Sequence, residues 1–275
     1  MRFFLLAMCL TLSLFTQASA KDADVQLENF NAKLRYNIYW NGLPIGRARV
    51  EAVETNSTYR ITVDTKTRGL AELFSPVRSV VVAKGIKAVD GSYIPTGYHA
   101  EGKSGDSDTI TDIGYDSSGI INARKRTPAD DPSYRPLVPL EDLADAHDAV
   151  SAFMILRREM MTNIKAKQKE TRVQTYDGRR LAEFTFRVIN PGTKMIHGQI
   201  VGMINTVLFR KPIMGYTEKE LKKYDKGDPT VHVYFSQNGM FMPLAIEAQV
   251  GFGMIRAEID EETMPQLTGQ SEIKE

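Results

Sequence analysis

The chain has 275 residues, of which 35 are Lys or Arg and 34 are Asp or Glu, so its formal net charge is +1. A hydrophobic content of 42% and a charged content of 25% are typical of a folded globular protein and exclude a disordered or collagen-like chain. The balanced charge argues against a nucleic-acid partner, because nucleic-acid-binding proteins carry a marked basic excess or a basic stripe.

The first twenty residues have the three parts of a secretory signal peptide. A basic start at Arg2 is followed by an apolar stretch over residues 3–15 and by small residues that end at Ala20. This stretch is shorter than the ~20 apolar residues that a membrane-spanning helix needs. We therefore expect export and cleavage after Ala20. The alternatives are a signal anchor and lipidation of Cys9, although Met8 stands where a lipidation motif has a small residue.

Cys9 is the only cysteine, so the mature chain has none and cannot form a disulfide even in an oxidising compartment. Its stability must come from a packed core, which a chain of this length can bury. No later segment has 18 consecutive apolar residues, so we expect a protein that does not span a membrane with helices. Residues 21–264 are expected to form a single β-rich domain, and residues 265–275 a flexible tail.

Alternating apolar and polar residues predict antiparallel strands in the first half of the domain. Leu34, Tyr36, Ile38 and Trp40 alternate with other residues, and Asn41-Gly42 follows directly as a two-residue hairpin signal. Further strands are predicted over residues 47–54, 59–67, 80–89, 93–101, 109–115 and 120–126.

The pattern changes at residues 127–139, where four prolines predict an extended loop. Apolar residues at three- and four-residue spacing then predict an amphipathic helix over residues 141–166, approximately. Its acidic start and basic end suit the helix dipole. It is the only helix that the pattern strongly supports.

Strands resume after this helix. Residues 171–176 turn at Asp177-Gly178 into a strand that ends at Ile189, and Asn190-Pro191-Gly192 is the predicted turn into residues 195–209. Residues 218–228 are predicted to be a solvated loop or short helix, and the last strands cover residues 231–235, 244–250 and 254–259. About a dozen strands joined by short turns predict an all-β, mainly antiparallel fold: a single strongly curved sheet or open barrel wrapped around one central amphipathic helix.

The sequence contains no convincing catalytic or metal-binding pattern. Residues 97–104 match the phosphate-loop spacing, but a turn and a strand follow them instead of the helix that binds phosphate. The aspartates at 106, 108 and 112 lack the glycine and the bidentate acid of a calcium loop. The four histidines lie far apart, and there is no G-x-S-x-G elbow. We therefore expect no catalytic residue, no cofactor and no metal, although metal ligands assembled from distant strands stay an alternative.

Methionine is abundant in the second half of the chain. It adapts to irregular apolar surfaces and is over-used at promiscuous binding sites. Together with the helix, these side chains could line a lipid-sized cavity on the concave side of the sheet; the alternative is that they fill a core. They are Met154, Met160, Met161, Met195, Met203, Met214, Met240, Met242 and Met254.

Four segments occur in a characteristic order: residues 34–46, 145–157, 176–180 and 231–253. In this order they resemble the bacterial exported proteins grouped as domain of unknown function 3108, over residues 34–259. Relatives often carry a cysteine before a segment like 211–216; this chain has His197-Gly198 in that region, so a family disulfide or thiol role does not apply. The resemblance implies a Gram-negative envelope protein with a strongly curved sheet around a helix, similar in shape to periplasmic lipoprotein-carrier proteins.

We therefore expect a non-enzymatic periplasmic protein of the cell envelope that binds a hydrophobic or lipid-like ligand, or a lipoprotein, in an apolar concavity. The residues expected to line it are Trp40, Phe153, Met154, Arg157 and Phe252. The alternatives are a scaffold for envelope integrity that binds an envelope protein, and an envelope hydrolase. An open apolar groove favours the carrier, a filled core the scaffold, and a polar cleft with strongly shifted pKa values the hydrolase.

Overall fold

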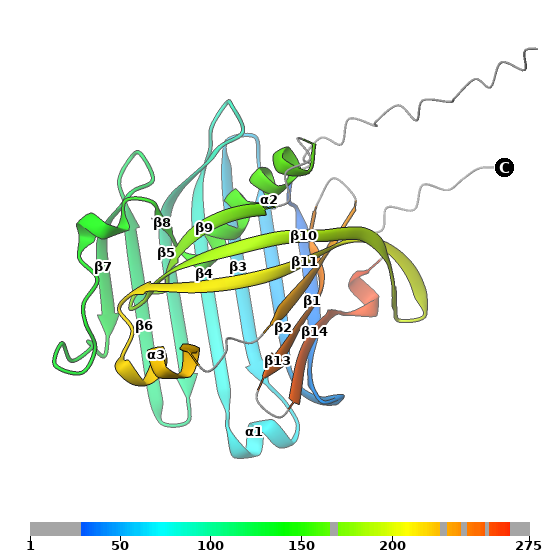
Figure 1. Cartoon of the computed structure of the whole chain (residues 1–275), viewed down its shortest axis with the longest axis horizontal. Coiled ribbons are helices and arrows are strands. Elements are labelled where there is room, and N and C mark those ends of the chain that lie inside the picture. The colour runs from blue at the N-terminus through cyan, green and yellow to red at the C-terminus, as the bar shows by residue number, and fades with distance from the viewer. Residues whose placement is uncertain (1–28, 166–169, 226–229, 238–240, 251–252, 265–275) are drawn as a thin grey trace, which may run out of the picture.

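The structure is a computed structural model that describes residues 29–165, 170–225, 230–237, 241–250 and 253–264. Within these ranges the strands form one sheet in the order β7-β6-β5-β4-β3-β2-β1-β14-β13-β12-β11-β10-β9-β8. The neighbouring pairs are antiparallel, with the exception of the short parallel pair β8–β9. The sheet curls strongly around α2 (Figure 1). The predicted all-β fold is confirmed.

The elements have the following bounds. The strands are β1 (Ala32–Trp40), β2 (Leu43–Glu54), β3 (Thr58–Thr67), β4 (Val77–Lys87), β5 (Tyr93–Ser104), β6 (Ser107–Tyr115), β7 (Ile121–Thr127), β8 (Ala146–His147), β9 (Glu170–Tyr176), β10 (Leu181–Ile196), β11 (Gln199–Met214), β12 (Val231–Ser236), β13 (Pro243–Val250) and β14 (Gly253–Ile259). The α-helices are α1 (Leu70–Phe74), α2 (Ala149–Lys165) and α3 (Glu218–Asp225), and the 3₁₀ turns are η1 (Leu140–Leu143) and η2 (Glu261–Thr263).

The hairpin between β1 and β2 forms where the sequence predicts it. Asn41 and Gly42 have φ values of 46° and 83°, the left-handed conformation that a two-residue hairpin needs and that these two residue types tolerate. The segment with phosphate-loop spacing lies in β5 and turns through Gly105 into β6, as expected of a strand and a turn.

The predicted turn at Asn190-Pro191-Gly192 is wrong. β10 continues through these residues, and the register to β11 shifts between Val188 and Asn190. Such a bulge lets a strand bend and carry a proline without ending. The chain turns instead at His197 and Gly198, whose φ values are 48° and 76°. The resulting long hairpin arches across the curved sheet (Figure 1).

The predicted start of the central helix near residue 141 is also wrong. Residues 140–143 form η1, residues 146–147 pair with β9 as β8, and α2 begins only at Ala149. Leu143 and Ala146 are completely buried in a cluster with Tyr176 and Leu181, so packing holds this segment away from the helix. The helix starts where Asp148 accepts hydrogen bonds from the amides of Val150 (3.0 Å) and Ser151 (2.8 Å), as an N-cap does.

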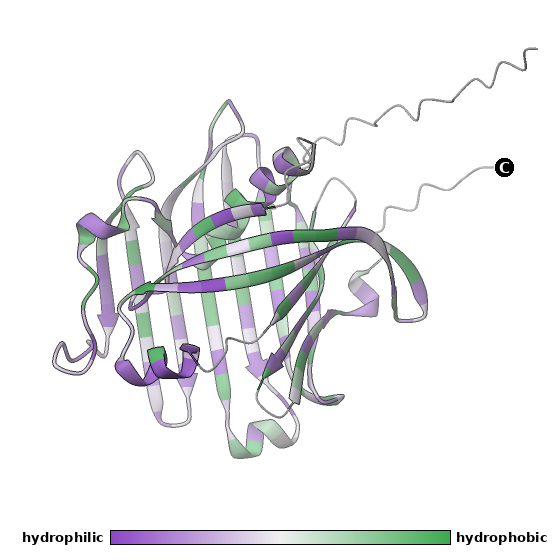
Figure 2. Cartoon of the chain, viewed as in Figure 1, coloured by the Kyte–Doolittle hydropathy of each residue, from purple (hydrophilic) through white to green (hydrophobic). Residues whose placement is uncertain are grey.

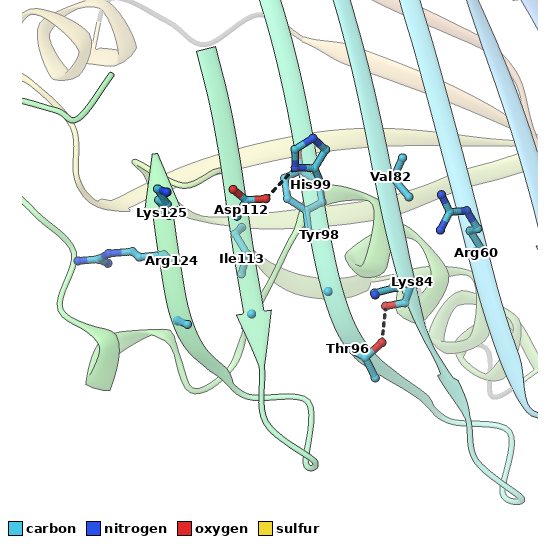
Figure 3. A pocket seen from close by; sticks show the side chains of 13 residues that line it. Arg60, Val82, Lys84, Thr96, Tyr98, His99, Asp112, Ile113, Arg124 and Lys125 are labelled. Carbon is cyan, nitrogen blue, oxygen red and sulfur yellow. Dashed lines mark hydrogen bonds and ion pairs between the residues drawn. The ribbon is translucent and has the colours of Figure 1, made fainter. Parts of the chain in front are cut away.

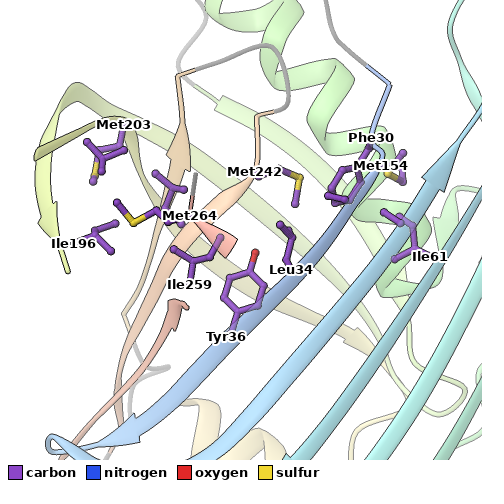
Figure 4. Packing of buried hydrophobic residues seen from close by; sticks show 14 of the residues in the cluster. Phe30, Leu34, Tyr36, Ile61, Met154, Ile196, Met203, Met242, Ile259 and Met264 are labelled. Carbon is purple, nitrogen blue, oxygen red and sulfur yellow. The ribbon is translucent and has the colours of Figure 1, made fainter. Parts of the chain in front are cut away.

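Side chains alternate between the two faces of the sheet, and Figure 2 shows apolar and polar bands alternating along the strands. The largest apolar cluster joins β1–β3, α2, the far end of the β10–β11 hairpin and the segment after β14. Figure 4 shows Met154 of α2 beside Phe30 and Ile61, with Met203 and Met264 at the other end of the same cluster. Of the methionines named above, Met154, Met160, Met203 and Met242 are buried in the apolar clusters, whereas Met195 and Met254 are exposed.

Candidate apolar binding groove

An apolar groove lies on the concave side of the sheet, between α2 and the strands β1–β3, β13 and β14. Its volume is about 280 Å³. The inward-facing positions of each strand supply its walls, because alternate residues of a strand point to the same face. The lining residues are Phe30, Tyr36, Ala48, Val50, Ile61, Val63, Ala149, Val150, Phe153, Met242, Pro243, Ile246 and Ala257.

The groove is apolar and accessible at the same time. Val50, Val63, Val150, Phe153 and Ile246 are only half-buried, so their carbon atoms are not fully covered by the protein. A cavity of ~150 Å³ lined by aliphatic and aromatic residues binds benzene, and ligand pockets begin near ~300 Å³. The groove therefore has room for one short hydrocarbon segment.

The polar atoms at the groove are already engaged. The hydroxyl of Tyr36 donates to the backbone oxygen of Pro243 at 2.8 Å, and burial raises the pKa of this tyrosine. An apolar ligand consequently meets no unsatisfied polar group of Tyr36, whose desolvation would oppose binding.

Phe30 and Phe153 form one wall of the groove. Their rings meet edge to face with centroids 6.5 Å apart, an arrangement that stabilises aromatic pairs. Phe153 also packs against the cluster around Phe235 and Phe241 on the other side of α2. It thus joins the groove to a second part of the core.

A buried ion pair behind Phe30 holds this wall in place. Arg157 of α2 is completely buried, lies over the ring of Phe30 at 5.1 Å, and approaches Glu54 to 3.5 Å. Glu54 also accepts hydrogen bonds from the Phe30 amide (2.7 Å), Lys87 Nζ (2.6 Å) and the Tyr93 hydroxyl (2.9 Å). We call these residues the Glu54 network. Burial lowers the pKa of Arg157, while Tyr93 and Glu54 oppose this shift.

A second polar network fixes the first turn of α2. The Asp148 carboxylate is completely buried and accepts a hydrogen bond from the Tyr115 hydroxyl at 2.8 Å, in addition to its two helix amides. Burial raises the pKa of Asp148, although its hydrogen bonds oppose that shift. One turn further, Ser151 bonds to the Tyr59 hydroxyl at 3.0 Å. Both networks tie α2 to the concave face beside the groove.

The five residues expected to line the concavity have different positions. Phe153 lines the groove, whereas Met154 lies completely buried in the core beside it and Arg157 belongs to the Glu54 network. Trp40 is half-buried at the end of β1, opposite Ile255, and is not among the lining residues. Phe252 lies outside the described residues.

Sequence reasoning missed most of the wall. Val50, Ile61 and Val63 sit at alternating positions of predicted strands, so the period-two pattern contained a signal for them. Phe30 precedes the first predicted strand. Ile246 of β13 and Ala257 of β14 come near Phe30 only because β14 pairs with β1 and β13 pairs with β14. No local pattern connects these last three residues.

A hollow of about 610 Å³, lined by both charged and apolar residues, lies on the other face of β3–β7 (Figure 3). Gly97 and Gly114 are register partners, and both line the hollow. His99 Nδ1 lies 2.7 Å from Asp112 and Nε2 lies 3.2 Å from Glu101, and these hydrogen bonds raise the pKa of the imidazole. Because both ring nitrogens face carboxylates, His99 is not paired with a hydroxyl nucleophile here.

The described ranges contain neither a helix that could cross a membrane nor a cluster of metal-binding side chains. No helix there combines the length and the apolar composition needed to cross a bilayer. In the same ranges, no three His, Cys, Asp or Glu side chains lie together in a way that would hold a metal ion.

Comparison with known proteins gives a similar solved structure and a family match. The chain is similar to a crystal structure described as a beta-barrel-like protein of domain of unknown function DUF1849 from Brucella abortus, with a TM-score of 0.49 and 11% identity over 86% of this chain and 97% of that one. A search of curated proteins found no match. The sequence profile of the family described as "Protein of unknown function (DUF3108)" matches residues 35–260. The chain therefore belongs to the DUF3108 family.

Proposed function

We propose that this protein binds a hydrophobic or lipid-like ligand, or the acyl chain of a lipidated partner, in the groove beside α2. The observation that carries the proposal is the accessible apolar lining from six separate segments, with half-buried Val50, Val63 and Phe153 at its surface. Burying this surface against a hydrocarbon is favourable by about 25 cal/mol per Å². Because binding alone requires no catalytic group, the proposed function is non-enzymatic.

The proposed location is the periplasm of a Gram-negative bacterium, with the signal peptide removed after Ala20. This part of the proposal rests on the basic, apolar and small-residue order of the first twenty residues. Mass measurement of the protein released from the periplasm tests it: the expected N-terminus is Lys21. A retained leader would contradict the cleavage.

The first test is native mass spectrometry of the mature protein purified from the periplasm without detergent, followed by organic extraction. The proposal expects an added mass of a few hundred daltons that extraction releases as a lipid. A ligand-free protein that also fails to bind added fatty acid would contradict it.

A matched pair of variants locates the site. Val50 lines the groove, whereas Val53 lies three residues further along β2 and is 51% exposed. Val50→Glu should weaken binding of the fluorescent fatty acid cis-parinaric acid by at least about tenfold, because it places a charge against the acyl chain. Val53→Glu makes the same chemical change on another surface and should leave binding unchanged.

A second variant guards against a folding defect in Val50→Glu. Ala48 lines the groove and is half-buried, so Ala48→Phe adds apolar volume where there is space. This variant should unfold at the same temperature as the parent, or at a higher one, yet lose cis-parinaric acid binding. Normal binding by folded Ala48→Phe would place the ligand elsewhere and overturn the groove assignment.

A further inference from the structure

A second cavity, of about 230 Å³, lies where β7 and the loop after it meet the turn between β9 and β10. Gly178 of this turn lies so close to Thr111 of β6 that a Cβ atom would be only 2.4 Å from its methyl group. We call this junction the seam. The residues lining its cavity are Arg124, Lys125, Arg126, Ala129, Asp130, Arg135, Pro136, Leu137, Val138, Tyr176, Gly178 and Arg179.

Positive side chains outnumber carboxylates among the lining residues of the seam cavity, while Glu220, which does not line it, pairs with Arg135. Five of its lining residues are Arg or Lys, and Asp130 is its one carboxylate among the described residues. Arg179 Nε lies 2.7 and 2.8 Å from the two oxygens of Asp130, and a second nitrogen of the same guanidinium also donates to it. The hydrogen bonds from Arg179 lower the pKa of Asp130, which therefore stays ionised and is largely neutralised by that one arginine.

Two further guanidinium groups lie at ion-pair distance from the same carboxylate without donating a hydrogen bond to it. Arg126 Nε is 4.0 Å and Arg135 Nε is 3.8 Å from Asp130, distances beyond a hydrogen bond. Both Nε atoms are buried and have no acceptor within the described residues. Burial and the neighbouring Arg179 lower the pKa of Arg126.

These two groups are held in position by their other nitrogens. Arg135, whose side chain is 7% exposed, donates to the Gly215 oxygen at 2.6 Å and to both oxygens of Glu220. Arg126 donates to the Thr111 hydroxyl at 2.7 Å. The free Nε donors are thus preorganised, and a buried unsatisfied donor is costly unless a partner binds it.

We propose that the seam cavity binds an oxoanion of the phosphate class through Arg126 and Arg135. Each Nε–H can donate one hydrogen bond to an anionic oxygen, and such charge-assisted hydrogen bonds are strong. The apolar side chains of Leu137, Val138 and Tyr176 line the same cavity, which suits a phosphate group that carries an organic substituent. This site uses other residues than the apolar groove, so the two assignments stand or fall independently.

Such a phosphate group can belong to a free phosphomonoester or to a phospholipid headgroup. Calorimetric titrations of the mature protein with inorganic phosphate and glycerol 3-phosphate, and sedimentation with phosphatidylglycerol vesicles, distinguish these sources. Binding of the free anions assigns a soluble ligand; binding of vesicles alone assigns a headgroup. Failure of all three at millimolar phosphate overturns the proposal.

Charge-matched variants test the location of the site. Arg126→Gln should weaken binding about tenfold, because it removes one charge-assisted hydrogen bond. Arg49→Gln removes the same charge from an exposed position of β2 and should change binding less than twofold. Equal weakening in both variants would show unspecific attraction and overturn the site. In the unmodified protein, phosphate should shift arginine Nε–H signals in NMR spectra, and unchanged signals would contradict the contact whether or not the variants fold.

Discussion

The Glu54 network and the seam cavity are both built around buried arginines, but their charges are balanced differently. At Glu54, one carboxylate receives Arg157, Lys87, the Tyr93 hydroxyl and a backbone amide, and the groups close around it behind the wall of the groove. At the seam, one aspartate faces three guanidinium groups, and two of their Nε donors have no acceptor in the described chain. The closed Glu54 network holds the neighbouring wall of the groove in place. The two Nε donors at the seam, which have no hydrogen-bond acceptor in the described chain, remain available to bind an anion in the cavity.

The largest expected loss of stability comes from removing Arg157 from the Glu54 network. Arg157→Met leaves Glu54 buried and removes the cation that spans from α2 to β2. Because Lys87 still pairs with Glu54 at 2.6 Å, we expect the lower end of the range for a broken buried pair, a loss of about 3 kcal/mol in the free energy of unfolding, measured by urea denaturation. The double variant Glu54→Leu/Arg157→Met also takes the acceptor from Lys87, the Tyr93 hydroxyl and the Phe30 amide, so it should be more destabilised than Arg157→Met. If both unfold at the parent's urea concentration, the network does not hold the wall.

Truncating the groove wall should have a smaller effect. Phe153→Ala removes the edge-to-face contact with Phe30 and a half-buried aromatic ring, so we expect a loss of about 2 kcal/mol. The same variant enlarges the groove and should favour bulkier hydrocarbons in competition with cis-parinaric acid. Phe74→Ala, at a ring that is 85% exposed on α1, is the control and should change neither stability nor binding.

Removing the cap of α2 is expected to rank third. Asp148→Ala leaves the amides of Val150 and Ser151 without their acceptor, which costs about 1–2 kcal/mol for a typical N-cap. Asp148→Asn keeps one acceptor oxygen, so thermal unfolding should show a distinctly smaller loss. Equal losses in the two variants would argue that the charge, and not the cap, is what the structure needs.

The smallest effect concerns the pH dependence of the seam. Burial alone would raise the pKa of Glu220, but hydrogen bonds from Arg135 and Thr217 lower it from 4.5 to about 2. The folded state therefore gains stability from Glu220 above pH 4.5, and this gain is lost as the pH falls towards 2. Because Glu220 is partly exposed, we expect less than about 1 kcal/mol. Glu220→Gln should lack this part of the acid dependence; an unchanged acid profile would contradict the assignment.

Local sequence patterns predicted most strands and the Asn41-Gly42 hairpin, because alternation and turn residues act over a few neighbours. They failed at Asn190-Pro191-Gly192 and at the start of α2, where long-range packing overrides the local signal. β10 passes a proline because β11 pairs along its length. Residues 140–147 do not join the helix because Leu143 and Ala146 are buried in the cluster around Tyr176 and Leu181. Of the predicted concave residues, helix periodicity selected Phe153, Met154 and Arg157, but it did not distinguish the accessible side chain from the two buried ones.

The sequence by itself determined the class of the fold, its antiparallel strands, the single long helix and the absence of cysteine from residue 21 onwards. Only the tertiary structure decided which apolar residues remain accessible in a groove and which arginines meet around one aspartate. The physical reason is distance along the chain: Phe30, Phe153 and Ile246 meet in the groove, and Arg126, Asp130 and Arg179 meet at the seam, only after the sheet has curled. The burial of a side chain and the balance of charge around it depend on all the residues that surround it in the folded protein, and these residues lie far apart in the sequence.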